Sequence, residues 1–225
     1  IYGNRMSYIY NIHCNFSKNT ATKIITKDHK DARGDGGVIY LYKRICTYLY
    51  NYKTNFIRNR SFCYGGVLYS RKLQYIANIF CTFVNNVATY YGGALYVYDN
   101  DIIENINTTF SGNKVECRTG GSIFLTSSKY LKNIRCSFLK NVALESSSSG
   151  GAFYVKNVHV VIVLDNIYIQ NRASDKAGAF YISESQKTTI NRTRFYRNSG
   201  NHAGAIQILN VKVLVVSKCH FMNNK

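Results

Sequence analysis

The sequence predicts an all-β fold, a right-handed parallel β-helix of about seven coils with about 27 residues in each. Three observations predict it. The chain of 225 residues contains no proline. A Phe-x-x-Asn mark recurs along the whole chain together with a glycine mark. The segment from the glycine mark to the next Phe keeps its length, whereas the segment from Asn to the next glycine varies.

Composition favours strands. Proline removes a hydrogen bond from a strand ladder, so its absence is typical of a chain that is mostly paired strand. The 20 Tyr and 12 Phe residues, with many Ile and Val, are residues that strands prefer. No apolar stretch reaches the roughly 18 residues that a membrane span needs. We therefore expect no transmembrane segment.

The Phe-x-x-Asn mark predicts an internal asparagine ladder. One copy of the mark substitutes Ile169 for Phe, with Asn171 one residue early. Amide side chains stacked coil upon coil bond one another and satisfy backbone groups of the turn. The predicted ladder consists of Asn19, Asn59, Asn86, Asn113, Asn141, Asn171, Asn198 and Asn224.

The glycine mark is a Gly-Gly or Ala-Gly pair before an apolar strand. Its second glycines are Gly37, Gly66, Gly93, Gly121, Gly151, Gly178 and Gly204. Paired strands tolerate no insertion, whereas an outward loop tolerates many, so the two kinds of spacing predict stacked coils. We interpret residues 1–225 as a single β-helix domain with a long loop insertion at about 20–35, and as part of a longer chain or assembly.

A leucine-rich repeat has a similar period and was the alternative architecture. It needs a leucine framework and commonly a helical segment, and the sequence has neither. Coils of a β-helix lie about 4.8 Å apart, so seven of them predict a rod roughly 34 Å long.

The two marks together resemble the repeats of chlamydial polymorphic outer-membrane proteins. Phe83-Val-Asn-Asn86 followed by Gly92-Gly-Ala-Leu95 is one example, and Phe195-Tyr-Arg-Asn198 with Gly204-Ala-Ile206 is another. Similar repeats occur in surface proteins of other bacteria and of protists. The resemblance implies a β-helix on a cell surface or in an extracellular assembly, often with an adhesive role.

Residues two apart in a strand share a face, so the residue two before each Phe should also point inward. This column should form a small Cys and Thr ladder beside the Phe rings. Its predicted members are Cys14, Thr54, Cys81, Thr108, Cys136, Ile167, Thr193 and Cys219.

An aromatic column is predicted to point outward from the strand after each glycine mark. Such rings either stabilise neighbouring strands by stacking or hold a glycan or a partner protein, and both interpretations stay open. The candidate contact residues are Tyr40, Tyr69, Tyr96, Phe124, Tyr154 and Tyr181.

The net charge of +18 predicts attraction to polyanions, such as acidic glycans or an acidic partner subunit. The basic residues are scattered rather than gathered in one block, so we expect no specific nucleic-acid function. The residue before the ladder Asn is basic in four coils, which is typical of a solvated face or of a polyanion track. This candidate basic stripe consists of Lys18, Arg58, Lys140 and Arg197.

A β-helix that cleaves acidic polysaccharides is the enzymatic alternative. Such an enzyme needs clustered carboxylates. One acidic group, Asp28, Asp31 and Asp35, lies among basic residues of the first loop. The other, Asp99, Asp101 and Glu104, is a weak calcium candidate. We predict no catalytic residue, no metal site beyond this candidate, and no cofactor.

Seven cysteines cannot all pair within one chain. The four in the inner column lie in nonadjacent coils, too far apart for disulfides. The states of Cys46, Cys63 and Cys117 stay open. Glycosylation sequons begin at Asn15, Asn59, Asn107 and Asn191, and we place Asn15 and Asn107 at outward positions within strands.

The sequence therefore predicts a non-enzymatic extracellular or cell-surface structural or adhesive repeat protein, or a subunit of a filament or surface assembly. The alternative is a β-helix that binds or degrades acidic polysaccharides. The expected partners are other protein subunits, including end-to-end copies of this chain, and glycans or acidic polymers.

Overall fold

The computed structural model describes residues 1, 7–22, 34–42 and 47–225, so most of the predicted loop at about 20–35 lies outside the described residues. The described residues form 27 strands in three parallel sheets. They contain no helix that is long and apolar enough to cross a membrane.

The first sheet has 13 strands and covers two faces of the coil. One face holds β1 (Tyr8–Ile12), β5 (Tyr48–Tyr52), β9 (Tyr75–Ile79), β13 (Ile102–Ile106), β23 (Lys187–Asn191) and β26 (Val213–Ser217). The other holds β4 (Ile39–Tyr42), β8 (Leu68–Arg71), β12 (Leu95–Tyr98), β22 (Phe180–Ser183) and β25 (Ile206–Leu209). Two 12-residue strands, β16 (Ile123–Ile134) and β19 (Phe153–Leu164), run through both faces and join them.

The second sheet has eight short strands, one from each coil. They are β2 (Asn15–Ser17), β6 (Asn55–Ile57), β10 (Thr82–Val84), β14 (Thr109–Ser111), β17 (Ser137–Leu139), β20 (Ile167–Ile169), β24 (Arg194–Tyr196) and β27 (His220–Met222). The third sheet has six two-residue strands. They are β3 (Thr20–Ala21), β7 (Arg60–Ser61), β11 (Val87–Ala88), β15 (Lys114–Val115), β18 (Val142–Ala143) and β21 (Arg172–Ala173).

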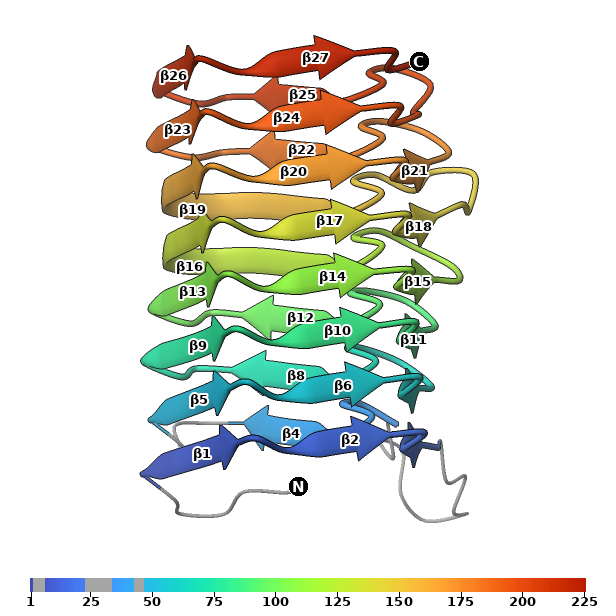
Figure 1. Ribbon diagram of the computed structural model, residues 1–225, viewed down its shortest axis with the longest axis vertical. Coiled ribbons are helices and arrows are strands. Elements are labelled where there is room, and N and C mark those ends of the chain that lie inside the picture. Colours follow the sequence, from blue (N-terminus) through green and yellow to red (C-terminus); the bar gives the residue numbers. More distant parts are fainter. Residues whose placement is uncertain (2–6, 23–33, 43–46) are drawn as a thin grey trace.

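The coils rise as a right-handed solenoid. In Figure 1 the nearer strands run from left to right, the fainter strands behind them run back, and the chain climbs from the N-terminal to the C-terminal coil. Every strand pairs in parallel with its equivalents in neighbouring coils. For example, Phe83 of β10 lies opposite Phe56 on one side and Phe110 on the other. The predicted fold class is confirmed.

The core is a continuous file of aromatic rings. Phe83 stacks on Phe56 with ring centroids 4.7 Å apart and on Phe110 at 4.8 Å, and all three are fully buried. Because identical rings meet at the ordinary strand spacing, the file combines hydrophobic burial with favourable ring stacking.

One assignment of the repeat was wrong. Phe138 pairs with Tyr168, not with Ile169, so the regular mark in that coil is Tyr168-x-x-Asn171. The Tyr168 ring stacks between Phe138 at 4.7 Å and Phe195 at 4.9 Å and is fully buried. The inner column shifts accordingly: buried Asn166 occupies the position that was given to Ile167, which is only half-buried.

In the coils whose corners are all described, three corners carry a residue with positive φ, a conformation that non-glycine residues adopt uncommonly. The two positions of the glycine mark require glycine for different reasons. Gly92 has a φ of +63°, whereas a Cβ on Gly93 would lie 2.2 Å from the carbonyl oxygen of Gly121 in the next coil. The first glycine turns the chain, and the second lets adjacent coils pack backbone to backbone.

Candidate functional site

Six aromatic side chains form one unbroken stack along the outer face of β4, β8, β12, β16, β19 and β22. We call this stack the aromatic ladder. Successive ring centroids are 4.9 to 5.3 Å apart, and the planes lie within 11° of parallel. Its members are Tyr40, Tyr69, Tyr96, Phe124, Tyr154 and Tyr181.

The aromatic ladder is half-buried rather than fully exposed, and Tyr181 is only 5% exposed. A second aromatic layer from the preceding loops covers part of it. The Tyr64 ring lies 4.9 Å from Tyr96, and the Tyr91 ring lies 4.6 Å from Phe124. The sequence analysis missed this layer, because both tyrosines lie in the segment between Asn and the glycine mark, which changes length from coil to coil.

Burial also changes the chemistry of the ladder hydroxyls. It raises the pKa of Tyr96 and of Tyr154 to about 12, with smaller contributions from neighbouring tyrosines. It raises the pKa of Tyr69 as well. These hydroxyls therefore stay protonated at physiological pH and can donate hydrogen bonds to a bound partner.

The predicted basic stripe lies at the corner that follows the second sheet. Lys18, Arg58, Lys140 and Arg197 are all exposed, and all have φ between 52° and 56°. Gly112 occupies the same corner with a φ of +62°. The corner conformation explains why this position alternates between long polar residues, Asn and Gly.

A second corner column, which the sequence analysis missed, precedes the same sheet. It also has positive φ in every coil and contains further cations. Its members are His13, Lys53, Phe80, Asn107, Arg135, Asp165, Arg192 and Lys218.

We call the surface bounded by the two corner columns the basic face. It comprises residues 13–18, 53–58, 80–85, 107–112, 135–140, 165–170, 192–197 and 218–223. It carries nine Lys or Arg side chains and one acid, Asp165.

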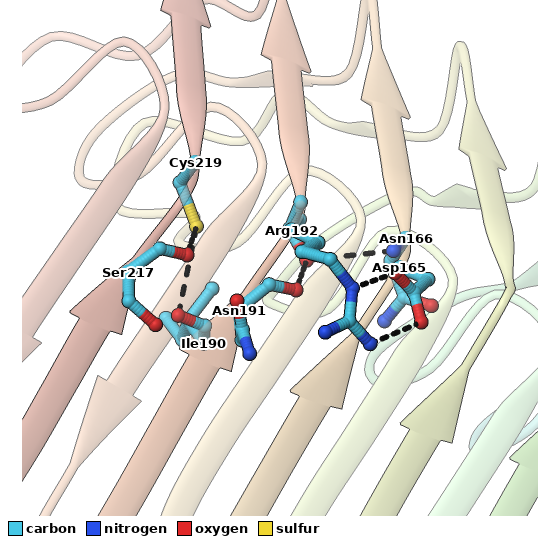
Figure 2. Close-up of polar contacts among 8 residues, drawn as sticks. Asp165, Asn166, Ile190, Asn191, Arg192, Ser217 and Cys219 are labelled. Atoms are coloured by element: carbon cyan, nitrogen blue, oxygen red, sulfur yellow. Dashed lines mark hydrogen bonds and ion pairs between the residues drawn. The ribbon is translucent and has the colours of Figure 1, made fainter.

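That single acid is already paired. Figure 2 shows the Arg192 side chain reaching across to Asp165 in the neighbouring coil, with the Nε atom 2.6 Å and the Nη2 atom 2.9 Å from the two carboxylate oxygens. Hydrogen bonding from Arg192, with the charges of Arg192 and Arg135, holds the pKa of Asp165 below its ordinary value. At neutral pH this carboxylate is charged and is occupied by its partner.

The inner side of this corner is held by small polar contacts. The Cys219 thiol lies 3.5 Å from the Ile190 carbonyl oxygen and 3.2 Å from that of Ser217 (Figure 2). Burial raises the pKa of Cys136, in the same column, to about 12. The buried Cys136 thiol is therefore a structural donor rather than a nucleophile.

Among the other described cysteines, Cys63 is buried and Cys117 is exposed. Cys46 lies outside the described residues. The described cysteines form no disulfide with one another.

Behind the basic stripe, the Asn side chains form a fully bonded column, and Asn113 illustrates it. Its Nδ2 donates to the carbonyl oxygen of Phe83 at 2.9 Å and to Oδ1 of Asn141 at 3.1 Å. Its Oδ1 accepts from the backbone N and from Nδ2 of Asn86, both at 3.0 Å. Each of the six interior members, from Asn59 to Asn198, thus ties three coils together without reaching solvent.

A second buried asparagine ladder, which the sequence analysis also missed, runs through five coils. Asn105 Nδ2 donates to Asn133 Oδ1 at 2.8 Å, and the earlier links are equally short. The ladder stops where Val163 replaces Asn. In that coil Asn166 takes over, donating to the Asn133 carbonyl oxygen at 3.1 Å.

The acidic group that was the calcium candidate is engaged with lysines. Asp101 lies 2.9 Å from the Lys129 amine, and Glu104 lies 3.2 Å from Lys132. The Tyr75 hydroxyl also donates to Glu104 at 2.6 Å. Among residues 34–42 and 47–225 no group of three His, Cys, Asp or Glu side chains could hold a metal ion. Asp28 and Asp31 of the other acidic group lie outside the described residues.

The four sequons differ in access. Asn15 is exposed in β2, and Asn191 is half-buried at the end of β23. Asn107 lies at a corner with a φ of 47°, not within a strand as expected. Asn59 is fully buried and both its amide hydrogens are bonded, so the folded chain cannot carry a glycan there.

Comparison with known proteins supports the repeat. Residues 80–98 match the family model of the Chlamydia polymorphic membrane protein repeat. This segment contains Phe83, Asn86 and the glycine mark at Gly92 and Gly93, and it is shorter than one full coil of the solenoid. The match shows that this segment of the solenoid is similar to that repeat. Neither the comparison with curated proteins nor that with solved structures gave a match.

Proposed function

From a solenoid whose repeat is of the polymorphic membrane protein type, we propose that this chain is a non-enzymatic cell-surface rod that acts as a structural or adhesive element. The aromatic ladder carries the proposal. It is a row of rings held in register along the rod, and five of its six rings are partly exposed to a partner.

The physical support for a contact role is the form of the ladder. Planar rings with a polar hydroxyl at one end suit glycans and protein partners, because they offer both apolar area and a hydrogen-bond donor. The backbone beneath them is fixed on both sides by parallel pairing, so little conformational entropy is lost on binding.

The competing function, cleavage of acidic polysaccharides, needs free carboxylates that face each other. The described acids support it poorly. Lysine or arginine partners occupy Asp101, Glu104 and Asp165. Binding of such polysaccharides without cleavage is favoured by a different observation, the basic face.

The test is a triple replacement in the aromatic ladder: Tyr69→Ser, Tyr96→Ser and Tyr154→Ser. Beads coated with the protein are applied to a glycan array and to cultured mammalian cells. If each lost ring removes about 0.5–1.5 kcal/mol of binding free energy, binding should weaken by about tenfold or more.

The matched control replaces three exposed aromatics on other surfaces, Phe62, Phe80 and Tyr130, by Ser. It should leave binding unchanged. Far-ultraviolet circular dichroism should show the same β content in both variants. Equal binding by the wild type and the ladder variant, with folding intact, would remove the aromatic ladder as the contact surface.

A further inference from the structure

The C-terminal half of the basic face has the densest positive charge. Residues 80–85 and 107–112 carry no charged side chain, so the cations of the later coils form a group of their own. This group comprises Arg135, Lys140, Arg192, Arg194, Arg197 and Lys218. All six are exposed, and the only acid between them is Asp165.

Among the described residues, most of these cations have no protein counter-ion. Arg192 is held by Asp165, but Arg194, Arg197 and Lys218 have no carboxylate within ion-pair distance in the described part of the chain. The Arg197 guanidinium instead lies over the Tyr196 ring, 4.8 Å from its centroid. Exposed cations left unpaired while a neighbour is paired are available to an external anion.

The same surface is hollowed. A shallow groove of about 400 Å³ lies between the corner and the second sheet. Its lining combines one apolar residue with polar and cationic groups: Asp165, Asn166, Ile167, Arg192, Arg194, Lys218 and His220. Donors therefore converge on the groove from three successive coils.

We infer that the C-terminal half of the basic face binds a linear anionic polysaccharide along the rod, through its sulfate or carboxylate groups. Equivalent positions repeat about every 4.8 Å from coil to coil, so the cations form rows parallel to the rod. Arg192 and Arg197 are five residues apart in nearly extended chain and thus roughly 15 Å apart, which gives the track its width.

Arginine suits this role. Its guanidinium presents a planar fork of donors that matches carboxylate and sulfate oxygens, and four of the six cations are arginines. The choice of polysaccharide over nucleic acid rests on the proposed surface location. The inference that an anion binds along this track does not rest on that location, because it follows from the cations alone.

The experiment measures retention of the protein on immobilised heparin in a salt gradient. Hyaluronan, single-stranded DNA and neutral dextran serve as soluble competitors. The test variant carries Arg194→Gln, Arg197→Gln and Lys218→Gln, which leaves the Asp165–Arg192 pair intact. The matched control carries Lys72→Gln, Lys114→Gln and Lys187→Gln, exposed lysines on other faces, and removes the same charge.

The wild type and the control should be retained at physiological salt, and the test variant should bind on the order of tenfold more weakly with a shallower salt dependence. Competition by hyaluronan, but not by dextran, would support the inference. Equal losses in test and control variants would overturn it, because net charge alone would then explain retention.

Preferential competition by DNA would overturn the choice of a polysaccharide. The aromatic-ladder variant is the independent check on the proposed function. It should keep heparin retention even if it loses adhesion, so the two proposals can fail separately.

Discussion

At the scale of single residues, the asparagine at the end of each repeat mark has the most exacting position. The Asn113 side chain is completely buried and makes five hydrogen bonds, three as donor, including one to the Ser122 hydroxyl, and two as acceptor. Among side chains of this size, only the asparagine amide offers two donors and an acceptor in one plane. The position therefore tolerates neither an apolar residue nor a charged one.

Replacing Asn113 by Ala should lower the free energy of unfolding by about 3 kcal/mol, because backbone groups of Phe83 and Asn86 lose partners where water cannot replace them. Equilibrium unfolding in urea measures the loss. The matched control is Asn55→Ala, an exposed asparagine in β6, which should cost less than about 1 kcal/mol. Similar losses in the two variants would contradict the ladder's role in stability.

Residue identity also explains why the repeat mark at residue 168 was assigned wrongly from the sequence. Tyr168 escaped the search for the repeat because a buried hydroxyl in an aromatic core is disfavoured, and apolar Ile169 stood beside it. In the structure, Tyr168 keeps the ring stack of its phenylalanine neighbours. Its neighbour Asn166 could not be placed inward until that register was known, since one residue of shift exchanges the two faces of a strand.

At the scale of elements, constant and variable segments have different physical roles. The strands from the glycine mark to Phe are paired on both sides, so their length is fixed by their neighbours. The segment after Asn holds only a two-residue strand before it leaves the stack. This contrast made the coils predictable from spacing, while the loop side chains that cover the aromatic ladder were not.

Insertion of three serines should expose this contrast. Between Ser146 and Ser147, in the loop between β18 and β19, the insertion should lower stability by less than about 1 kcal/mol. Between Leu139 and Lys140 it should cost several times more, because Asn141 would leave its ladder. Thermal melting followed by circular dichroism compares the two. Equal melting temperatures would contradict the assignment of constant and variable segments.

At the scale of the whole molecule, most contacts join neighbouring coils, although the Arg60–Glu116 ion pair spans two coils. Each Phe ring contacts only the rings one coil above and below, at about the strand spacing. Stability in such a solenoid is expected to be a sum of coil terms and nearest-neighbour terms.

Double replacements test this one-dimensional behaviour. Phe83→Leu combined with Phe110→Leu should show a coupling energy of about 0.5 kcal/mol or more, because their rings stack. Phe83→Leu combined with Phe138→Leu should be additive within about 0.5 kcal/mol, since roughly 10 Å separates them. Urea unfolding of the single and double variants gives both values. Strong coupling in the distant pair would mean that the rod responds as one globular unit.

The two asparagine ladders also give the rod a dipole along its long axis. In every link of both ladders the amide nitrogen points toward the later coil and the oxygen toward the earlier one. Aligned amide dipoles add, as peptide dipoles do in a helix. Two such rods lying side by side therefore interact differently when they run parallel and when they run antiparallel. The antiparallel arrangement is electrostatically preferred.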